Sequence, residues 1–509
     1  MKRFLALALS VLMILCVLLM AGCDSDTGKN TTASTKKPTQ TSGTTGNGDS
    51  GSTEEGGDSG EINFYGKMPG YEDISFGGET FILYGADGES DGFNSAKEIY
   101  SDESDAISVA VRERNALIET LYDCIIKGEA RSAPGSDVSA EITGNQHTID
   151  LYTHHYAISG VATGGNAYNL LTIGSRSIDF TKSWWDQQYV NSYTIKNSSG
   201  QETLYSIVGD FALTAFDCTH TLVFNKTVYA NTASIASTDI YQLVRDKKWT
   251  MDQFAFMVKE ATYDANGDST IDSIAGVGDI AGWIRTIHAS HGLHTASGLS
   301  IMSTTNGVFA FDVDKNTETW TNVINKSAEL WAMPESQTIS YSNIPPTLAG
   351  GYALFASEIL GSSLGNLKDY DAEIGLLPYP LHSETQENYA HYVDNHVYSY
   401  SIPVSCDHPD TVADFLAIYA FHSSGIVRPA YINVYAYDYC ADPDSAEMLD
   451  IILSTMTWDP GYLSASLESD LSNMIQNNKN QVAQFAAKKA ANANQWIADF
   501  IAGIDDNNV

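Results

Sequence analysis

Basic residues are scarce in this sequence. Its 509 residues contain 27 lysines and arginines against 63 aspartates and glutamates, which gives a formal net charge of −36 at pH 7. Nucleic acids and anionic lipid surfaces bind through clusters of positive charge, so neither is expected as a partner. A surface this negative suits a protein held outside the cell, where it attracts cations rather than phosphates.

Cysteine is also rare, and no two cysteines form a CxxC pair. Two of the six lie within the first 23 residues, and the other four are far apart in sequence: Cys124, Cys218, Cys406 and Cys440. This spacing excludes a zinc-ribbon or redox signature. Disulfides can form outside the cell, and buried free thiols fit the spacing equally well. No cofactor motif is present, so no cofactor is required.

The first residues have the pattern of an export signal. Lys2 and Arg3 precede an apolar run over residues 4–20, and small residues then lead to Cys23. The run is short for a membrane span and ends as bacterial lipoprotein signals do. We expect a lipoprotein signal peptide over residues 1–22 and a lipid-modified (palmitate-type) Cys23 that anchors the chain to the extracellular face of the bacterial membrane. An ordinary signal peptide or a signal anchor is the alternative.

Residues 23–60 contain almost no large apolar side chain. Serine, threonine, glycine and aspartate dominate, and such a composition cannot repay the entropy cost of ordering. We expect a disordered tether, which as a flexible coil would span roughly 35 Å. The folded part would then stand away from the membrane.

The remaining 449 residues, 61–509, exceed what one hydrophobic core usually holds, so at least two domains are expected. Residues 80–84 read as a strand, residues 107–121 have apolar residues at helical spacing, and residues 124–126 read as the next strand. Strand, helix and strand in this order predict an α/β fold with parallel strands. Further along, Val412, Phe415, Leu416 and Tyr419 have the spacing of a helix that lies on a sheet, and Thr250 is a good N-cap for the helix after it.

Polar and aromatic residues end the next predicted strand, residues 148–155. In open α/β sheets, ligands lie at the carboxyl ends of strands. Tyr152, His154 and His155 are therefore candidate ligand-binding residues, with a solvated loop as the alternative.

Several phrases follow one another in the order found in a known family. They are FNK at 224–226, GLLPYP at 375–380, SIPVS at 401–405, DHPDTVADFLAIYA at 407–420 and VRPAYIN at 427–433. In these phrases the chain resembles the carbohydrate-type, family 1 extracellular solute-binding lipoproteins of ABC importers.

The resemblance implies a type II, two-lobed periplasmic-binding-protein-like fold whose lobes are discontinuous and joined by hinge crossings. Lobe one would comprise residues 61–217 and 378–425, and lobe two residues 218–377 and 426–509. The chain would then be a monomer that binds a sugar or similar small solute and meets an ABC permease, without being an enzyme.

The resemblance also nominates a ligand site with one wall from each lobe. Sugar rings stack on indoles while nearby polar groups bind hydroxyls. Two groups of residues are expected to supply the walls: Tyr152, His154, Trp184, Trp185 and Asp210 from lobe one, and Trp283, His291, Glu358 and Tyr431 from lobe two. Glu358 is the sharpest candidate of lobe two, because it follows an apolar run and would lie at a strand's carboxyl end. Core packing is the alternative for each tryptophan.

An acidic loop over residues 264–272 partly matches a calcium-binding loop. Oxygen ligands would come from Asp264, Asn266, Asp268, Thr270 and Asp272. Glycine stands at position 4 instead of 6, and the expected acid at position 12 is replaced by alanine. A structural calcium with weak coordination and a plain Asx-rich turn are both consistent with this pattern.

A secreted surface hydrolase acting on carbohydrate is the alternative function. Acidic residues are plentiful, so counting cannot dismiss a carboxylate pair, yet no motif nominates one. Residues 361–365, in the exposed loop predicted between two strands, formally match the GxSxG pattern of esterases, but the sequence after them runs into a strand instead of the helix that a nucleophile elbow needs.

Overall fold

The computed structural model describes residues 62–89, 92–155, 164–272, 278–440, 442–464 and 467–506. The chain divides into two compact units, residues 1–61 and 62–509, and only the second is described. The predicted signal peptide, Cys23 and the tether therefore lie outside the described residues. In the described part, no helix is both long enough and apolar enough to cross a bilayer.

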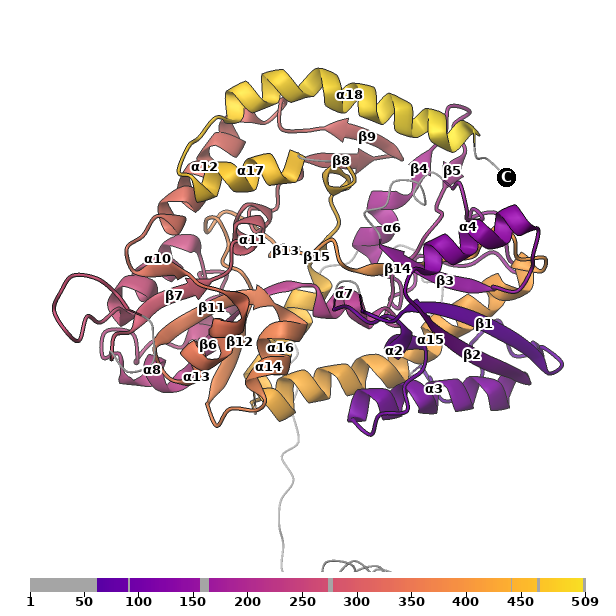
Figure 1. Cartoon of the computed structure of the whole chain (residues 1–509), viewed down its shortest axis with the longest axis horizontal. Coiled ribbons are helices and arrows are strands. Elements are labelled where there is room, and N and C mark those ends of the chain that lie inside the picture. Colours follow the sequence, from indigo (N-terminus) through magenta and orange to yellow (C-terminus); the bar gives the residue numbers. More distant parts are fainter. Residues whose placement is uncertain are drawn as a thin grey trace, which may run out of the picture. The chain divides into compact units, whose positions relative to one another are not determined.

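The first sheet has the strand order β14-β3-β1-β2 (Figure 1). Its strands are β1 (Glu79–Ala86), β2 (Cys124–Arg131), β3 (Leu151–His155) and β14 (Tyr398–Ser401). β1 pairs in parallel with β2 and β3, whereas β14 runs antiparallel to β3. The helix α3 (Ala106–Tyr122) connects β1 to β2, which confirms the predicted parallel crossover.

The long helix α15 (Pro409–Ile432) brings a distant part of the chain back onto this unit, where it packs against α3 (Figure 1). Val412, Phe415, Leu416 and Tyr419 recur at helical spacing, and all four are fully buried. Phe415 stacks on Phe81 of β1, with ring centroids 4.2 Å apart. The apolar stripe predicted from the sequence is therefore the face that covers the sheet.

The second sheet has the order β10-β7-β11-β6-β12. Its strands are β6 (His220–Asn225), β7 (Ala281–Arg285), β10 (Ser336–Thr338), β11 (Ala353–Ile359) and β12 (Ile374–Leu377). β7 pairs in parallel with β10 and β11, and β6 runs antiparallel to both β11 and β12. The carboxyl ends of β7, β11 and β12 therefore meet the amino end of β6 at one edge.

The helix α10 (Met251–Ala261) packs against β7 and β11 of this sheet. As the sequence predicts, Thr250 caps it, because the Thr250 side chain accepts a hydrogen bond from the amide of Gln253 at 3.3 Å.

Shorter helices complete the described part: α2 (Ala96–Ile99), α4 (Pro134–Gly144), α6 (Gln187–Tyr193), α7 (Leu213–Asp217), α8 (Lys226–Asn231), α9 (Ile240–Arg245), α11 (Ala289–Thr295), α12 (Thr317–Trp331), α13 (Ile344–Ala349), α14 (Leu360–Leu367), α16 (Pro443–Ser454) and α17 (Leu467–Gln476). The long α18 (Val482–Asp506) ends it. Three small strand pairs are β4 (Ile195–Lys196) with β5 (Glu202–Thr203), β8 (Met302–Thr305) with β9 (Val308–Phe311), and β13 (His391–Tyr392) with β15 (Met456–Thr457).

One expectation about local structure is wrong. The stretch after β11 was predicted to be an exposed loop, and the structure forms α14 there instead. Leu360 and Leu367, seven residues apart, lie on one face of that helix and are both buried. The GxSxG match at 361–365 thus falls inside a helix instead of on the strand-to-helix turn of a nucleophile elbow.

Candidate functional site

Polar side chains gather at the edge of the second sheet where β11 ends and β6 begins. In the antiparallel register of these strands, Glu358 pairs with Thr221 and Ile359 pairs with His220. Thr286 follows the last residue of β7, at the same edge. Glu358, His220 and Thr286 are all buried, although each has a polar side chain.

The returning chain brings Asp394 to this edge. The amide of Asp394 donates to the carbonyl of Cys218 at 2.9 Å, and the His220 Nε2 lies 3.7 Å from Asp394 Oδ2. The other carboxylate oxygen pairs with Nδ1 of His396. Burial alone would raise the pKa of Asp394, but His220 and His396 outweigh burial and hold that pKa well below its usual range.

Hydrogen-bonding capacity at this edge is not satisfied within the described residues. Both ring nitrogens of His220 and the Glu358 Oε2 are buried without a hydrogen-bond partner there. Buried polar groups are nearly always hydrogen-bonded in folded proteins, because leaving one unpaired is costly. Burial also raises the pKa of Glu358, an effect that His220 opposes. The edge thus presents both nitrogen and carboxyl groups suited to the hydroxyls of a polar ligand.

Aromatic rings surround these groups. The ring of Tyr392 lies 4.9 Å from that of His220 and stacks on His291 of α11 at 5.2 Å. On the other side, the ring of His396 lies 6.1 Å from that of His155, the last residue of β3 in the first sheet. We call this set the histidine–carboxylate cluster: His155, His220, His291, Glu358, Asp394 and His396. It joins the carboxyl ends of strands from both sheets.

A second polar site is a pocket of about 400 Å³ that we call the Trp185 pocket. Its lining includes Trp185, Asp186, Asp210, Arg428 and Met456. The Arg428 Nε lies 3.4 Å from Asp210 Oδ1. Burial raises the pKa of Asp210 to about 6, although Arg428 opposes the shift. An indole beside carboxylates and a guanidinium is a combination that binds sugar rings and hydroxyls.

Backbone pairing connects the two sites. Met456 of β15 lines the Trp185 pocket, and β15 pairs in parallel with β13, which carries Tyr392 of the cluster's aromatic wall. The β13–β15 strand pair therefore contributes residues to both the Trp185 pocket and the aromatic wall of the histidine–carboxylate cluster.

Trp185 and Asp210, two of the five residues nominated in the first wall, line the same pocket. Trp185 is nevertheless only 2% exposed, and its Nε1 donates to the carbonyl of Asp179 at 3.1 Å. Tyr152, His154 and Trp184 are also buried and do not line the Trp185 pocket. The Nε2 of His154 is hydrogen-bonded to Ser401 Oγ of β14 at 2.8 Å, and Trp184 packs edge-on against Phe421 of α15. The sequence could not show that both faces of β3 are covered.

The four residues expected in the second wall also separate into two that lie in a polar site and two that are packed in the core. Glu358 and His291 lie in the histidine–carboxylate cluster. Trp283 is fully buried, with its Nε1 donating to Ser357 Oγ at 2.7 Å. Tyr431 is part of α15 and donates to Asp217 Oδ1 at 2.7 Å. In this conformation neither Trp283 nor Tyr431 exposes a ring face to a ligand.

Sequence reasoning missed His220, Asp394 and His396. His220 stands at the start of a buried strand, and Asp394 and His396 stand between two predicted strands, which was a usable signal. Their proximity depends on two passes of the chain that are more than 170 residues apart, and no local pattern contains that information.

The acidic loop closes on itself. Oxygens of Asp264 accept hydrogen bonds from the amides of Gly267 and Ser269 at 2.6 and 2.8 Å, and Asn266 and Asp268 cap amides two residues ahead. Among the histidines, cysteines, aspartates and glutamates of the described residues, none of the three nominated aspartates, Asp264, Asp268 and Asp272, belongs to a converging group of metal-binding side chains. A calcium ion at this loop stays a prediction.

The four cysteines of the described part, Cys124, Cys218, Cys406 and Cys440, are buried, and none of them forms a disulfide. Burial raises the pKa of three of them, Cys124, Cys406 and Cys440, to about 12, so these thiols are protonated at neutral pH as long as no metal binds them.

No protein-family model matches the chain, and no curated protein matches it in sequence. Its structure is nevertheless similar to solved structures of binding proteins. A family 1 extracellular solute-binding protein from Bifidobacterium longum subsp. infantis is 15% identical, with a TM-score of 0.50 over 82% of this chain and 98% of that one.

Two further structures agree. The galacto-N-biose-/lacto-N-biose I-binding protein of the ABC transporter from Bifidobacterium longum, in complex with lacto-N-biose, is 11% identical, with a TM-score of 0.52 over 84% of this chain and 98% of that one. RafE from Streptococcus pneumoniae is 12% identical, with a TM-score of 0.50 over 85% and 99%. The chain thus has the two-lobed α/β fold of these solute-binding proteins, as the sequence predicts.

Proposed function

We propose that this protein is an extracellular substrate-binding lipoprotein that captures a sugar or oligosaccharide between two lobes and delivers it to an ABC transporter. Each lobe would be built around one of the two sheets, with the boundaries predicted from the sequence. The fold shared with sugar-binding proteins supports the class of function, and the polar groups of this chain support the class of ligand.

The observation that carries the proposal is the histidine–carboxylate cluster. It lies at the carboxyl ends of strands, where ligands bind in α/β folds, and draws residues from both sheets. His220 and Glu358 have buried atoms without partners in the described structure, next to the aromatic ring of Tyr392. The uncharged hydroxyls of a sugar would form hydrogen bonds with these atoms. They would add no charge next to the buried His220–Asp394 pair.

The carboxylates of the Trp185 pocket favour binding over hydrolysis. Asp186 caps α6 by accepting from the amide of Tyr189 at 2.8 Å, and its other oxygen accepts from Trp458 Nε1 at 3.0 Å. Asp210 pairs with Arg428. Glycosidases need one free carboxylic acid and one free carboxylate flanking the scissile bond, whereas both groups here are engaged by the protein.

Delivery requires a partner and a location. A chain anchored through Cys23 and a flexible tether would remain near a permease in the same membrane while its folded part searches for solute. We infer that the protein acts as a monomer. It would contact the membrane only through its lipid anchor.

A thermal-shift screen over mono- and oligosaccharides tests the function, because a ligand that binds only the folded state raises the melting temperature. Sugars that shift the transition are then titrated by calorimetry, and the same sugars are checked for cleavage by chromatography. Saturable binding without cleavage supports the proposal. Cleavage would favour the hydrolase, and no binding across the screen would contradict a carbohydrate ligand.

A further inference from the structure

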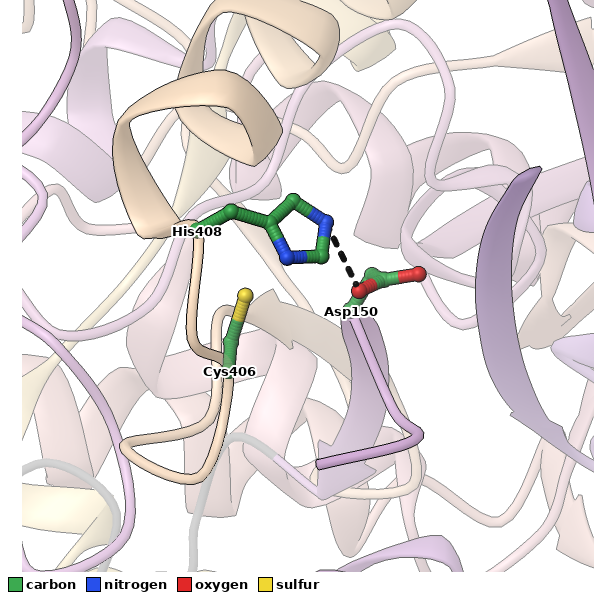
Figure 2. A group of neighbouring side chains, drawn as sticks. All are labelled: Asp150, Cys406 and His408. Atoms are coloured by element: carbon green, nitrogen blue, oxygen red, sulfur yellow. Dashed lines mark ion pairs between the residues drawn. The ribbon is translucent and has the colours of Figure 1, made fainter. Parts of the chain in front are cut away.

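Three metal-binding side chains converge at the other end of the first sheet. Asp150 immediately precedes β3, while Cys406 and His408 precede α15, and one ligand atom from each lies within 4.8 Å of the others. Figure 2 shows the Cys406 sulfur and the Asp150 carboxylate turned toward the His408 ring. Glu79, the first residue of β1, lies next to this group, because its Oε1 is 3.3 Å from the His408 Nε2, but it is not one of the three converging residues.

The two nitrogen–oxygen separations at His408 each have the length of one edge of a tetrahedral zinc site. Zinc binds nitrogen and oxygen at about 2.0–2.1 Å, so two such ligands at the tetrahedral angle lie about 3.3–3.4 Å apart. The His408 Nε2 is 3.3 Å from Asp150 Oδ1 and 3.3 Å from Glu79 Oε1. One sulfur, one nitrogen and two carboxylate oxygens are also the ligand types that zinc accepts.

Hydrogen bonds already orient the ligands. The Nδ1 of His408 lies 2.7 Å from the Asp407 carboxylate, and Asp150 uses its other oxygen to accept from the amide of Ile82 at 2.7 Å. A carboxylate that holds one imidazole nitrogen protonated leaves the other free to bind a metal, which is the usual outer-shell arrangement of zinc sites.

One atom of the group, the buried His408 Nε2, has no hydrogen-bond partner in the described structure. The Cys406 thiol beside it is 98% buried and unoxidised. An inert buried cysteine in a core has apolar neighbours, whereas this one faces an imidazole and a carboxylate.

We propose that Asp150, Cys406 and His408 bind a zinc ion, with the neighbouring carboxylate of Glu79 as the fourth ligand once the metal is bound. The site would tie the returning chain, just before α15, to the starts of β1 and β3 in the first sheet. It lies away from the carboxyl ends where the solute is proposed to bind, so it is a structural clip. On binding, the Cys406 thiol loses its proton to the solvent and the thiolate sulfur bonds to zinc, which makes affinity rise with pH.

The test uses the whole folded chain, stripped with a chelator and dialysed. Zinc is titrated with a competing chromophoric chelator, and melting is followed with and without one equivalent of metal. We expect one equivalent bound and a melting temperature higher by several degrees. Cobalt(II) should give the intense visible bands of tetrahedral coordination and a thiolate charge-transfer band in the near ultraviolet.

Variants assign the site. Cys406→Ser should lose the charge-transfer band and weaken binding at least tenfold, and His408→Gln should weaken it likewise. Cys440→Ser, which also alters a buried free thiol, is the matched control and should bind as the wild type. Circular dichroism of each variant without metal confirms that it is folded.

Two results would overturn the proposal. Absence of stoichiometric zinc and cobalt binding would leave His408 as a protonated partner of Glu79 and Asp150. Binding that persists in Cys406→Ser would assign the metal elsewhere, and His291, His294 and Glu468, the other converging group in the described part, would be substituted next.

Discussion

His220 and Asp394 join the outward and return passes of the chain between the two sheets. Their side chains lie 3.7 Å apart at the closest nitrogen and oxygen, and both are buried. The backbone supports the contact, because Thr219 bridges Val393 in antiparallel fashion and the Asp394 amide donates to Cys218. We therefore expect the polar part of the proposed ligand site to lie at this His220–Asp394 contact, where the chain connects the two sheets.

The first prediction concerns ligand affinity. His220→Gln and Glu358→Gln should each weaken binding of a sugar found in the screen by about 1–3 kcal/mol, since each removes a buried group with unmet hydrogen-bonding capacity. Calorimetric titration measures the change. Glu373→Gln is the matched control, because Glu373 is exposed and precedes β12 at the opposite end of the same sheet. Wild-type affinity in both site variants would place the ligand elsewhere.

Trp283 should act on stability rather than on binding. It is fully buried and its Nε1 donates to Ser357 Oγ, so Trp283→Ala should lower the free energy of unfolding by about 3–5 kcal/mol. Ser357→Ala removes only the hydrogen bond and should cost about 1–2 kcal/mol. Urea unfolding measures both. A Trp283→Phe variant that folds stably but binds sugar more weakly would instead return this residue to the ligand wall.

Glu98 should make stability depend on pH. It is fully buried, its oxygens accept from the Thr214 amide at 2.5 Å and the Tyr400 hydroxyl at 2.7 Å, and burial raises its pKa to about 8. A folded-state pKa above the unfolded value means that the stabilisation is complete below about pH 4.5 and is lost as pH rises toward 8.

The variant Glu98→Gln lacks this titration. Between pH 4.5 and pH 8, wild type should lose on the order of 3–5 kcal/mol relative to the variant, with little further change above pH 9. Urea unfolding at a series of pH values tests this, with the exposed Glu103→Gln as control. Parallel pH curves for wild type and Glu98→Gln would show that Glu98 is already ionised in the folded protein.

The acidic loop gives a metal prediction of its own. Asp264 already caps two amides of the turn, so Asp264→Ala should destabilise the loop even in the absence of metal, by about 0.5–2 kcal/mol. If calcium binds, millimolar calcium should raise the melting temperature of the wild type but not of Asp268→Asn. An identical melting temperature with calcium and with chelator would show that the loop is a plain Asx-rich turn that does not bind calcium.

Local features were predictable from the sequence, and distant contacts were not. The spacing of Val412, Phe415 and Tyr419 predicts a covering helix because burial on one face needs that periodicity. The position of Thr250 likewise predicts a helix start, since an N-cap bond is local. Glu358 was placed correctly at a strand end because the apolar run before it defines where β11 stops.

The remaining site residues depend on how the chain folds back. His220 and Asp394 are 174 positions apart, and Trp283 has the same sequence signature as a ligand-stacking indole but lies under α10, against Phe254. The residues of the proposed zinc site were missed for a related reason. Cys406 and His408 are only two residues apart, yet Asp150 and Glu79 come from distant parts of the chain, before β3 and at the start of β1, so a search for paired cysteines does not find them.

The paired backbone at Thr219 and Val393 has a consequence for how a solute would be met. When one body rotates against another, displacement grows with distance from the axis, and segments that cross between the bodies side by side define that axis. His220 and Asp394 adjoin the crossing, so a closing motion would move them little. An arriving solute would then find the His220–Asp394 contact already formed before closure, so less affinity would be lost to ordering these side chains.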